Sequence, residues 1–388
     1  MVRHAAVAIV GGGIVGASVA YHLAKRGVRD VVILDRGAEP GTGSTGRATG
    51  GFRAQFETPV NVGLSLLARE KLKAFRDEIG VDPGYSPVGY LWIANTERAL
   101  EQLRAALLVQ RSAGLAEAEE LDADDVARLN PAVPITDVLG AAWCPTDGFI
   151  KPMDMLRGYL AAAERLGATI EWGIEVNEIG IGKNSRAHEV RTSAGDVAAD
   201  AVVNAAGAWA GLVECGGVSA LPVVPLKRQV ALSVATDVLQ ESMPMTIFVE
   251  TGFHLRVRDG RVMLLKPTTP VAGDPFDTTV DDRWIESVRA EAARRVPTLG
   301  SLEIDRSACY AGLYEMSPDQ HAILGPAPWC ENLFLVNGSS GHGVMHSPAL
   351  GELLSEIICD GVASSLDVSA LRPTRFSERA LNATSGLL

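Results

Sequence analysis

Residues 7–35 read VAIVGGGIVGASVAYHLAKRGVRDVVILD, which is the pattern of a β-strand, an α-helix and a second β-strand. The first apolar run ends in Gly11, Gly13 and Gly16, and the second ends in Asp35. In such a unit the first glycine permits a tight turn, the second lets a pyrophosphate approach the backbone, and the third lets the helix pack closely on the strand. The helix N-terminus then faces the phosphates, and Asp35 lies where a carboxylate accepts hydrogen bonds from ribose hydroxyls. This stretch therefore predicts a dinucleotide-binding βαβ unit.

The glycine motif alone does not identify the dinucleotide. Arg36 keeps a 2′-phosphate, and hence NADP, open as a ligand, although an arginine after such a strand is more often a surface residue or an adenine neighbour. An NAD(P)-dependent reductase is therefore one alternative for the function.

The composition limits the class of protein. The chain has 388 residues, enough for two or three domains, and its 47% hydrophobic and 21% charged residues are typical of a soluble globular protein. A net charge of −12 argues against nucleic acid or an anionic membrane as a partner. No stretch approaches the roughly 18 uninterrupted apolar residues of a spanning helix, so we expect no membrane span. The cysteines are scattered, without a CxxC motif or a metal-like pairing with histidine, so we expect no metal site and a cytoplasmic setting.

The middle of the chain alternates helical and strand patterns. A loop of small residues over 41–56 is expected to wrap backbone donors and hydroxyls around the ligand. Helices are predicted over 58–81, 97–113, 151–167 and 281–295, and Asp122 is predicted to cap a short helix that leads to Leu129. Strands are predicted over 86–95, 168–179, 195–210 and 305–313, with a hairpin over 253–266 that turns at Asp259 and Gly260. No linker separates these patterns, so we expect interleaved domains.

A second glycine-rich loop lies near the end of the chain. Residues 332–358 read NLFLVNGSSGHGVMHSPALGELLSEII, which predicts a strand over 333–336, a loop, and a helix capped by Ser347 with Pro348 at its first position. Such a loop and helix start offer hydrogen-bond donors to an electron-rich ligand.

Seven stretches carry a resemblance to a known family. They are residues 11–27, the strand ending in Asp35, GSTGR (43–47) with GGFRAQF (50–56), VVNAAGAWA (202–210), PLKRQ (225–229), GLYEMSPDQHAILGP (312–326) and NGSSGHGVMHSP (337–348). Together they resemble the D-amino-acid-oxidase-like flavoproteins, and more narrowly the branch of sarcosine oxidases, their β subunits and the β subunits of proline dehydrogenases. The resemblance implies an α/β fold, α+β overall, in which a Rossmann-type FAD-binding domain (1–80, 145–220 and 325–388) is interleaved with an antiparallel-sheet substrate domain (81–144 and 221–324).

The resemblance also implies where FAD binds. Gly11, Gly13 and Gly16 would hold the pyrophosphate, Asp35 the adenosine ribose, Val176 the adenine, and residues 341–345 the pyrimidine end of the flavin ring. The phosphate and ribityl region would lie against Ser44, Thr45 and Arg47. The full set of cofactor-binding residues adds Ile14, Val15, Arg36, Gly43, Ala48, Thr49, Gly50, Ala206, Gly207, Gly312, Gly341, His342, Gly343, Val344 and Met345.

Three departures from the family pattern bear on chemistry. Relatives with covalent flavin have a cysteine where this chain has Gly312, so we expect noncovalent FAD. Glycine and D-amino-acid oxidases have a carboxylate-binding arginine where Tyr314 stands, which makes that branch less favoured. Monomeric sarcosine oxidases have a lysine at the position of Met345, which leaves Arg53 as the candidate for the substrate carboxylate.

Four residues are candidates for catalysis, each with a structural alternative. Arg53 either grips a carboxylate or pairs with a neighbouring acid. Lys266 matches a lysine that sarcosine oxidases use for oxygen reduction, or is an ordinary strand-end residue. His342 is either a loop residue that bonds backbone near the flavin or a proton shuttle. Tyr314 closes the pocket, bonds the substrate, or is a core aromatic.

The resulting expectation is oxidation of a secondary or N-methyl amino acid, sarcosine- or proline-like, to an imine by hydride transfer to FAD, with O2 or an electron-acceptor subunit as the partner. Alternatives are a dehydrogenase subunit of a multi-subunit electron-transfer complex, an oxidase of glycine or D-amino acids, and the NAD(P)-dependent reductase. A non-catalytic flavin-binding subunit is a remoter alternative, supported by the missing lysine at Met345.

Overall fold

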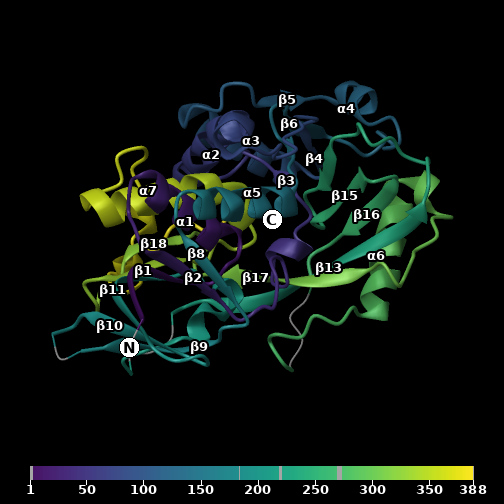
Figure 1. Ribbon diagram of the computed structural model, residues 1–388. Coiled ribbons are helices and arrows are strands. Elements are labelled where there is room, and N and C mark those ends of the chain that lie inside the picture. Colours follow the sequence, from purple (N-terminus) through teal and green to yellow (C-terminus); the bar gives the residue numbers. More distant parts are fainter. Residues whose placement is uncertain (1–2, 183, 218–220, 269–272, 388) are drawn as a thin grey trace.

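The computed structural model describes residues 3–182, 184–217, 221–268 and 273–387. Two large sheets dominate it, and Figure 1 shows them on opposite sides of the molecule, with β1, β2 and β8 in one and β13, β15 and β16 in the other. The first sheet contains β1 (Arg3–Val10), β2 (Val31–Asp35), β8 (Thr169–Trp172), β9 (Val176–Ile181), β10 (Ala187–Thr192), β11 (Val197–Asn204), β12 (Glu214–Cys215), β18 (Ile323–Pro326) and β19 (Leu333–Asn337). The second contains β4 (Tyr90–Ala94), β5 (Glu119–Leu121), β6 (Gly140–Cys144), β13 (Val224–Ala235), β14 (Met245–Phe248), β15 (Phe253–Arg258), β16 (Arg261–Leu265) and β17 (Tyr310–Met316). A small pair joins β3 (Gly51–Phe52) to β7 (Gly148–Phe149).

The centre of the first sheet is parallel, as the βαβ pattern predicts. β1 pairs in parallel with β2 and β11, β2 with β8, and β11 with β19. Val7 and Ile9 pack into one core and Ala8 and Val10 into another, so the strand is buried on both faces and reads as a continuous apolar run. The helices packed against this sheet are α1 (Ile14–Lys25), α5 (Pro152–Arg165) and α7 (Gly343–Asp360), and α2 (Pro59–Ile79) packs on α7.

The second sheet is mostly antiparallel, and its two faces serve different purposes. Leu255 and Leu264 pack with Trp284 of α6 (Asp282–Arg295) in a separate hydrophobic core. The residues next to these in each strand point to the opposite face of the sheet. Four of them form a row across neighbouring strands, in which each residue pairs with the next: Trp92, Ile247, His254 and Leu265. Because side chains alternate along a strand, this row faces away from α6, toward the cavity described below. The remaining helices are α3 (Glu97–Ser112) and α4 (Ala123–Leu129), with single turns at 45–47, 207–212, 297–299, 369–371 and 373–376.

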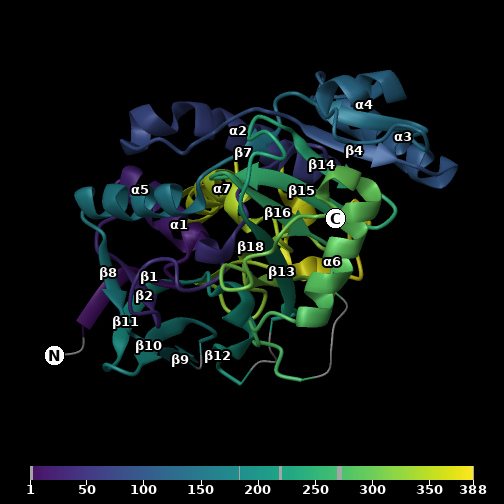
Figure 2. The ribbon, with the colours of Figure 1, turned by 90° about the vertical axis from the view of Figure 1, so that its right-hand side faces the viewer.

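The chain passes repeatedly between the two sheets. Residues 3–35, 169–215 and 323–337 supply the first sheet, and residues 90–144 and 224–316 supply the second. Figure 2, turned by 90°, shows the same separation, with α1 and α5 beside the first sheet and α6 beside the second. We therefore propose the division expected above, 1–80, 145–220 and 325–388 against 81–144 and 221–324.

Most predicted elements are confirmed. The long helices begin and end within a few residues of the predicted limits, and the hairpin β15–β16 turns at Asp259 and Gly260. Asp122 caps α4 through a reciprocal capping box with Asp125, because each carboxylate accepts the other residue's backbone N–H.

Four local predictions are wrong. The strand predicted over 195–210 ends at Asn204, and residues 207–212 form a 3-10 helix instead. The strand predicted from Asp305 begins only at Tyr310, because Asp305 forms a turn by accepting hydrogen bonds from the backbone and hydroxyl of Ser307. Residues 168–179 form two strands rather than one, since the chain bends at Gly173, where φ is +73°. The last helix begins at Gly343 and not at Pro348, which lies inside α7. Pro348 has no N–H for the carbonyl of Val344, and the Ser347 hydroxyl donates to that carbonyl instead, at 2.9 Å.

Among the residues that the structure describes, no helix combines the length and the apolar character needed to cross a membrane.

Candidate active site

A cavity of about 1190 Å³ lies between the two sheets and is lined by residues of both. This volume exceeds the range of about 300–1,000 Å³ that is usual for ligand pockets, so a dinucleotide and a second small molecule can share it. One end borders the βαβ unit, and the other borders the second sheet and the start of α7.

The three glycines of the motif have separate structural roles. Gly11 has φ of +108°, and a Cβ there would overlap the carbonyl oxygen of Ala205. A Cβ at Gly16 would overlap the carbonyl oxygen of Gly11, so Gly16 lets α1 approach β1 and does not line the cavity. Gly13 lines the cavity, and the nearest atom to a Cβ there is Thr45 Oγ1 at 3.6 Å. Its missing side chain therefore leaves space for a ligand.

Asp35 is held rigidly at the end of β2. Its Oδ2 accepts the backbone N–H of Gly12 and its Oδ1 that of Gly37, both at 2.6 Å. Each oxygen keeps a further acceptor position on the cavity side, which suits ribose hydroxyls. Trp172 closes this end, since its ring lies about 3.0 Å from where a Cβ of Gly12 would be.

The glycine-rich loop links the two sheets along the cavity. Ser44 Oγ donates to the carbonyl of Leu313 at 2.8 Å, and the Arg47 guanidinium donates to the carbonyl of Thr42 at 2.6 Å. A Cβ at Gly312 would lie 3.0 Å from Arg47 Cβ, so this glycine lets the loop pack on β17. The loop thus runs beside the cavity from the βαβ unit to the second sheet.

The far end of the cavity meets the start of α7. The helix has no side-chain cap, and residues 343–345 of its first turn line the cavity, so their backbone N–H groups are available to a ligand. Glu315 lies beside them, where its Oε1 accepts the backbone N–H of Ser339 at 3.2 Å. Its Oε2 and the Ser339 hydroxyl are buried without a hydrogen-bond partner among the described residues. Burial raises the pKa of Glu315, and these unpaired atoms fit a polar ligand at this end.

All the residues predicted to bind the cofactor line this cavity except Gly16. They come from six separated parts of the chain: the βαβ unit (Gly11, Gly13, Ile14, Val15, Asp35, Arg36), the glycine-rich loop (Gly43, Ser44, Thr45, Arg47, Ala48, Thr49, Gly50), the start of β9 (Val176), the residues after β11 (Ala206, Gly207), β17 (Gly312), and the start of α7 with the loop before it (Gly341, His342, Gly343, Val344, Met345). Their assigned contacts with FAD stay predictions.

Arg53 also lines the cavity, but backbone carbonyls hold its guanidinium. Nη1 donates to Gln55 O at 2.7 Å, and Nη2 donates to Leu387 O at 3.0 Å and lies 3.3 Å from His342 Nε2. The guanidinium carbon lies 4.1 Å from the centroid of the Phe56 ring. Arg53 is therefore buried in the wall, and part of its hydrogen-bonding capacity joins the end of the described chain to the site.

The other three catalytic candidates border the cavity as well. The Lys266 ammonium donates to Ser287 Oγ of α6 at 3.2 Å. His342 directly precedes α7, and its backbone N–H donates to Ser339 O at 2.9 Å. Tyr314 is half-buried, and a Cβ at Gly341 would overlap its ring, so the glycine there makes room for Tyr314. The catalytic roles of these residues stay predictions.

Arg228 and His254 are cavity residues that the sequence analysis missed. Leu226, Arg228 and Val230 alternate along β13 and therefore share a face. That alternation within PLKRQ is the signal that could have identified Arg228. For His254 the signal is the alternation of apolar and polar residues along β15, FHLRVR, which places His254 on the face opposite Phe253 and Leu255.

Comparisons with known proteins agree with this geometry. A sequence model of the DAO family, FAD dependent oxidoreductase, matches residues 6–357. The chain is 30% identical over 422 residues to FAD-dependent oxidoreductase domain-containing protein 1 of Xenopus laevis, covering 96% of this chain and 83% of that protein. It is 29% identical over 359 residues to glycine oxidase of Geobacillus kaustophilus (strain HTA426), covering 91% of this chain and 92% of that protein. The crystal structure of L-proline dehydrogenase from P. horikoshii superimposes with a TM-score of 0.90 at 26% identity, covering 98% of this chain and 100% of that chain.

Proposed function

This chain belongs to the DAO family of FAD-dependent oxidoreductases, and on that basis we propose that it oxidises a secondary or N-methyl amino acid to an imine. Bound FAD supplies the acceptor for the hydride that leaves the carbon next to nitrogen. The protein's part is to bind the amino acid, orient that carbon, and favour the neutral amine. Two relatives support an amino-acid substrate by their names, glycine oxidase and L-proline dehydrogenase.

The charge distribution along the cavity is the observation that carries this proposal. The nucleotide end is lined by five acidic residues, Asp35, Glu39, Glu175, Glu178 and Glu214, and by the cations Arg36 and Arg47, so its net formal charge is negative. The end beside the second sheet and α7 has the cations Arg53, Arg228 and Lys266, and Glu315 is the carboxyl group there among the described residues. A positive potential attracts a carboxylate and lowers the pKa of a nearby substrate ammonium, which favours the neutral amine that can lose a hydride.

We further propose that FAD is bound noncovalently. Among the described residues that line the cavity there is no cysteine, and Gly312 stands where the covalent relatives have one. Acid precipitation should release the flavin into the supernatant. Flavin that stays with the precipitate would contradict this part of the proposal.

A specific observation favours a second candidate, a dehydrogenase that passes electrons to another protein. The Lys266 ammonium is held by Ser287 on α6, which weakens the case for a cation that promotes O2 reduction at the flavin. Abundant peroxide from the isolated chain would argue against this candidate. Turnover with an artificial acceptor but not with O2 would support it.

Anaerobic bleaching of the flavin absorbance tests the substrate class. We expect sarcosine, proline or another N-alkyl or cyclic amino acid to bleach the flavin, and D-amino acids and glycine to bleach it more slowly. Bleaching by a 2-hydroxy acid, with no response to any amine, would overturn the proposal.

A further inference from the structure

Arg228 stands at the junction of two cavities. A second cavity of about 350 Å³ shares Trp92, Arg228, Ile247, Pro267, Tyr314 and His342 with the first. It is bounded on its other side by Glu250, by residues 251–252 and by the C-terminal segment 385–387. A ligand that spans the two cavities therefore passes the Arg228 side chain.

The register of the second sheet makes room for this guanidinium. Arg228 pairs with Gly312 across β13 and β17, so no side chain stands directly opposite. Its guanidinium carbon lies 5.3 Å from the centroid of the Tyr314 ring. The aromatic ring orients the cation but does not neutralise its charge.

Arg228 lacks a protein counter-ion among the described residues. None of them accepts a hydrogen bond or forms an ion pair with its guanidinium, and burial lowers its pKa. Arg256 on the same face differs, since it donates to Thr49 O at 3.0 Å and stacks 3.3 Å from the Phe149 ring centroid. A half-buried charge without an acceptor is unfavourable, and an anionic ligand removes that cost.

The neighbouring polar groups are less suited to bind an anion. Arg53 already donates to the carbonyls of Gln55 and Leu387. His254 Nδ1 lies 2.8 Å from the carbonyl oxygen of Gly252, so Nδ1 carries the proton and Nε2 is an acceptor. Burial, with help from the charges of Arg228 and Arg53, lowers the His254 pKa to about 4, so the ring is neutral at physiological pH.

We propose that Arg228 binds the carboxylate of the substrate and thereby makes the enzyme select amino acids over amines that lack a carboxyl group. The planar guanidinium can donate two parallel hydrogen bonds to a carboxylate. The apolar side chains of Ile247 and Leu265 on the same face then lie beside the rest of the substrate. This inference rests on the proposed function, and it assigns the contact with the substrate carboxylate to one of the three cations at that end of the cavity.

Arg228→Gln and Arg228→Lys test the inference in the FAD-loaded protein. Spectral titration of the flavin with pyrrole-2-carboxylate measures carboxylate binding without turnover. We expect Arg228→Gln to weaken that binding about 10- to 100-fold, as for the loss of a hydrogen-bonded charge partner. Rapid-reaction reduction should show the same loss in substrate affinity for proline or sarcosine. Pyrrolidine and dimethylamine, which lack the carboxyl group, should react alike with both proteins.

Lys227→Gln is the matched control. Lys227 is the neighbour of Arg228 on β13, and its ammonium donates to Asp277 at 2.6 Å, outside the cavity lining. The control removes one positive charge and should leave carboxylate binding unchanged. If Arg228→Gln no longer binds FAD, Arg228→Lys serves as the test, because lysine keeps the positive charge but lacks the planar guanidinium. We expect Arg228→Lys to bind pyrrole-2-carboxylate about tenfold more weakly than the parent protein.

The outcomes separate this inference from the proposed function. If no amine bleaches the flavin of the parent protein, the proposed function fails, while the titration with pyrrole-2-carboxylate still tests Arg228. If amino acids bleach the flavin but Arg228→Gln binds the carboxylate within about twofold of the parent, the inference about Arg228 is overturned.

Discussion

At the scale of single residues, Asp147 supports the loop that carries Arg53. Its carboxylate accepts the backbone N–H of Ala54 at 2.7 Å and that of Gln55 at 3.4 Å. Asp147 is fully buried, and burial raises its pKa to about 7 although these two donors act in the opposite direction. Protonation of Asp147 is therefore coupled to the stability of the site.

Asp147→Asn should flatten the pH dependence of stability. The folded pKa of Asp147 is raised above its unfolded value, so its contribution to stability is full below about pH 4 and is lost as the pH rises toward about 7. Asparagine keeps an acceptor oxygen for Ala54 but does not titrate. Urea unfolding between about pH 4 and pH 8 measures the slope. The exposed Asp196→Asn is the control, and an unchanged slope in Asp147→Asn would contradict the argument.

At the scale of elements, the two glycines at the junction of β1 and α1 have different roles, one in helix packing and the other at the cavity. Gly16 lies against the backbone of Gly11, whereas Gly13 faces the cavity with space around it. The two glycines belong to one motif, yet only the observed distances tell which of them a ligand depends on. The same holds for α7, where Pro348 lies within the helix and residues 343–345 present the free N–H groups.

Gly13→Ala and Gly16→Ala should therefore fail in different ways. We expect Gly16→Ala to lower the unfolding free energy of the apoprotein by about 1–3 kcal/mol, because the added methyl forces α1 away from β1. Gly13→Ala should leave the apoprotein nearly as stable and weaken FAD binding, because its methyl occupies ligand space. Denaturant unfolding and flavin fluorescence titration measure the two effects. Equal losses of stability in both variants would refute this separation.

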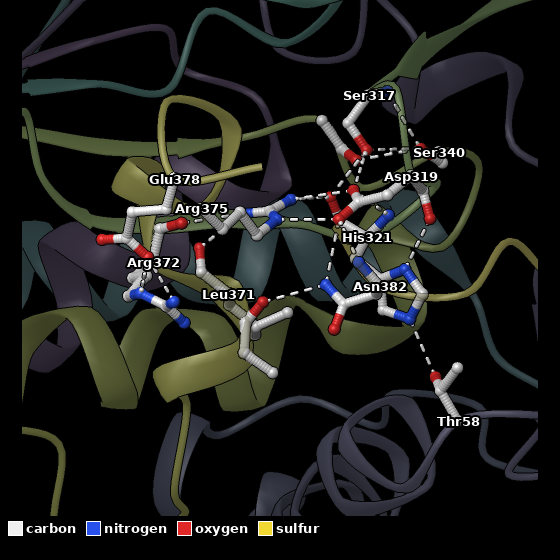
Figure 3. A network of polar contacts seen from close by, with 12 residues as sticks. Thr58, Ser317, Asp319, His321, Ser340, Leu371, Arg372, Arg375, Glu378 and Asn382 are labelled. Atoms are coloured by element: carbon white, nitrogen blue, oxygen red, sulfur yellow. Dashed lines mark hydrogen bonds and ion pairs between the residues drawn. The ribbon is translucent and has the colours of Figure 1, made fainter. Parts of the chain in front are cut away.

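At the scale of the whole molecule, a buried polar network ties the C-terminal segment to the loop before α7. Figure 3 shows Arg375 pointing at Asp319, with Nε–Oδ2 at 2.8 Å and Nη2–Oδ1 at 3.0 Å. Asn382 donates to the same carboxylate at 3.0 Å, and Ser340 Oγ, beside the loop before α7, accepts the backbone N–H of Ser317. Burial alone raises the pKa of Asp319, but Arg375 and Asn382 outweigh it and hold the pKa well below its usual range.

Arg375→Met should be strongly destabilising, and Arg372→Met should not. Arg375 and Asp319 are both buried, so removing one partner leaves an unpaired charge and costs about 3–5 kcal/mol. Arg372, three residues before Arg375, pairs with Glu378 on the surface, and its loss should cost only about 0–1 kcal/mol. Chemical denaturation of both variants measures the difference. Similar losses would show that the network of Figure 3 is not what holds the segment.

The local elements of the fold, and much of the cofactor site, could be predicted from the sequence. Three features depend on residues that are close together in the chain: the βαβ unit, the hairpin at Asp259 and Gly260, and the capping box at Asp122. Their hydrophobic periodicity and turn residues can be recognised in the sequence without knowledge of the fold. The start of β17 could not be placed, because the turn at Asp305 depends on its side-chain hydrogen bonds to Ser307 and on an ion pair with Arg261 of a distant strand.

By itself the sequence indicated a dinucleotide-binding βαβ unit, since glycine spacing and strand endings are local signals, and its resemblance to a known family implied the flavoprotein fold. Only the tertiary structure shows how differently the two cavity arginines, Arg53 and Arg228, are held. Arg53 donates to the carbonyl of Leu387, 334 residues away, while Arg228 faces Tyr314 through the pairing of β13 with β17. The acceptors of a guanidinium come from whichever segments the fold brings to it, and no spacing within the chain encodes them.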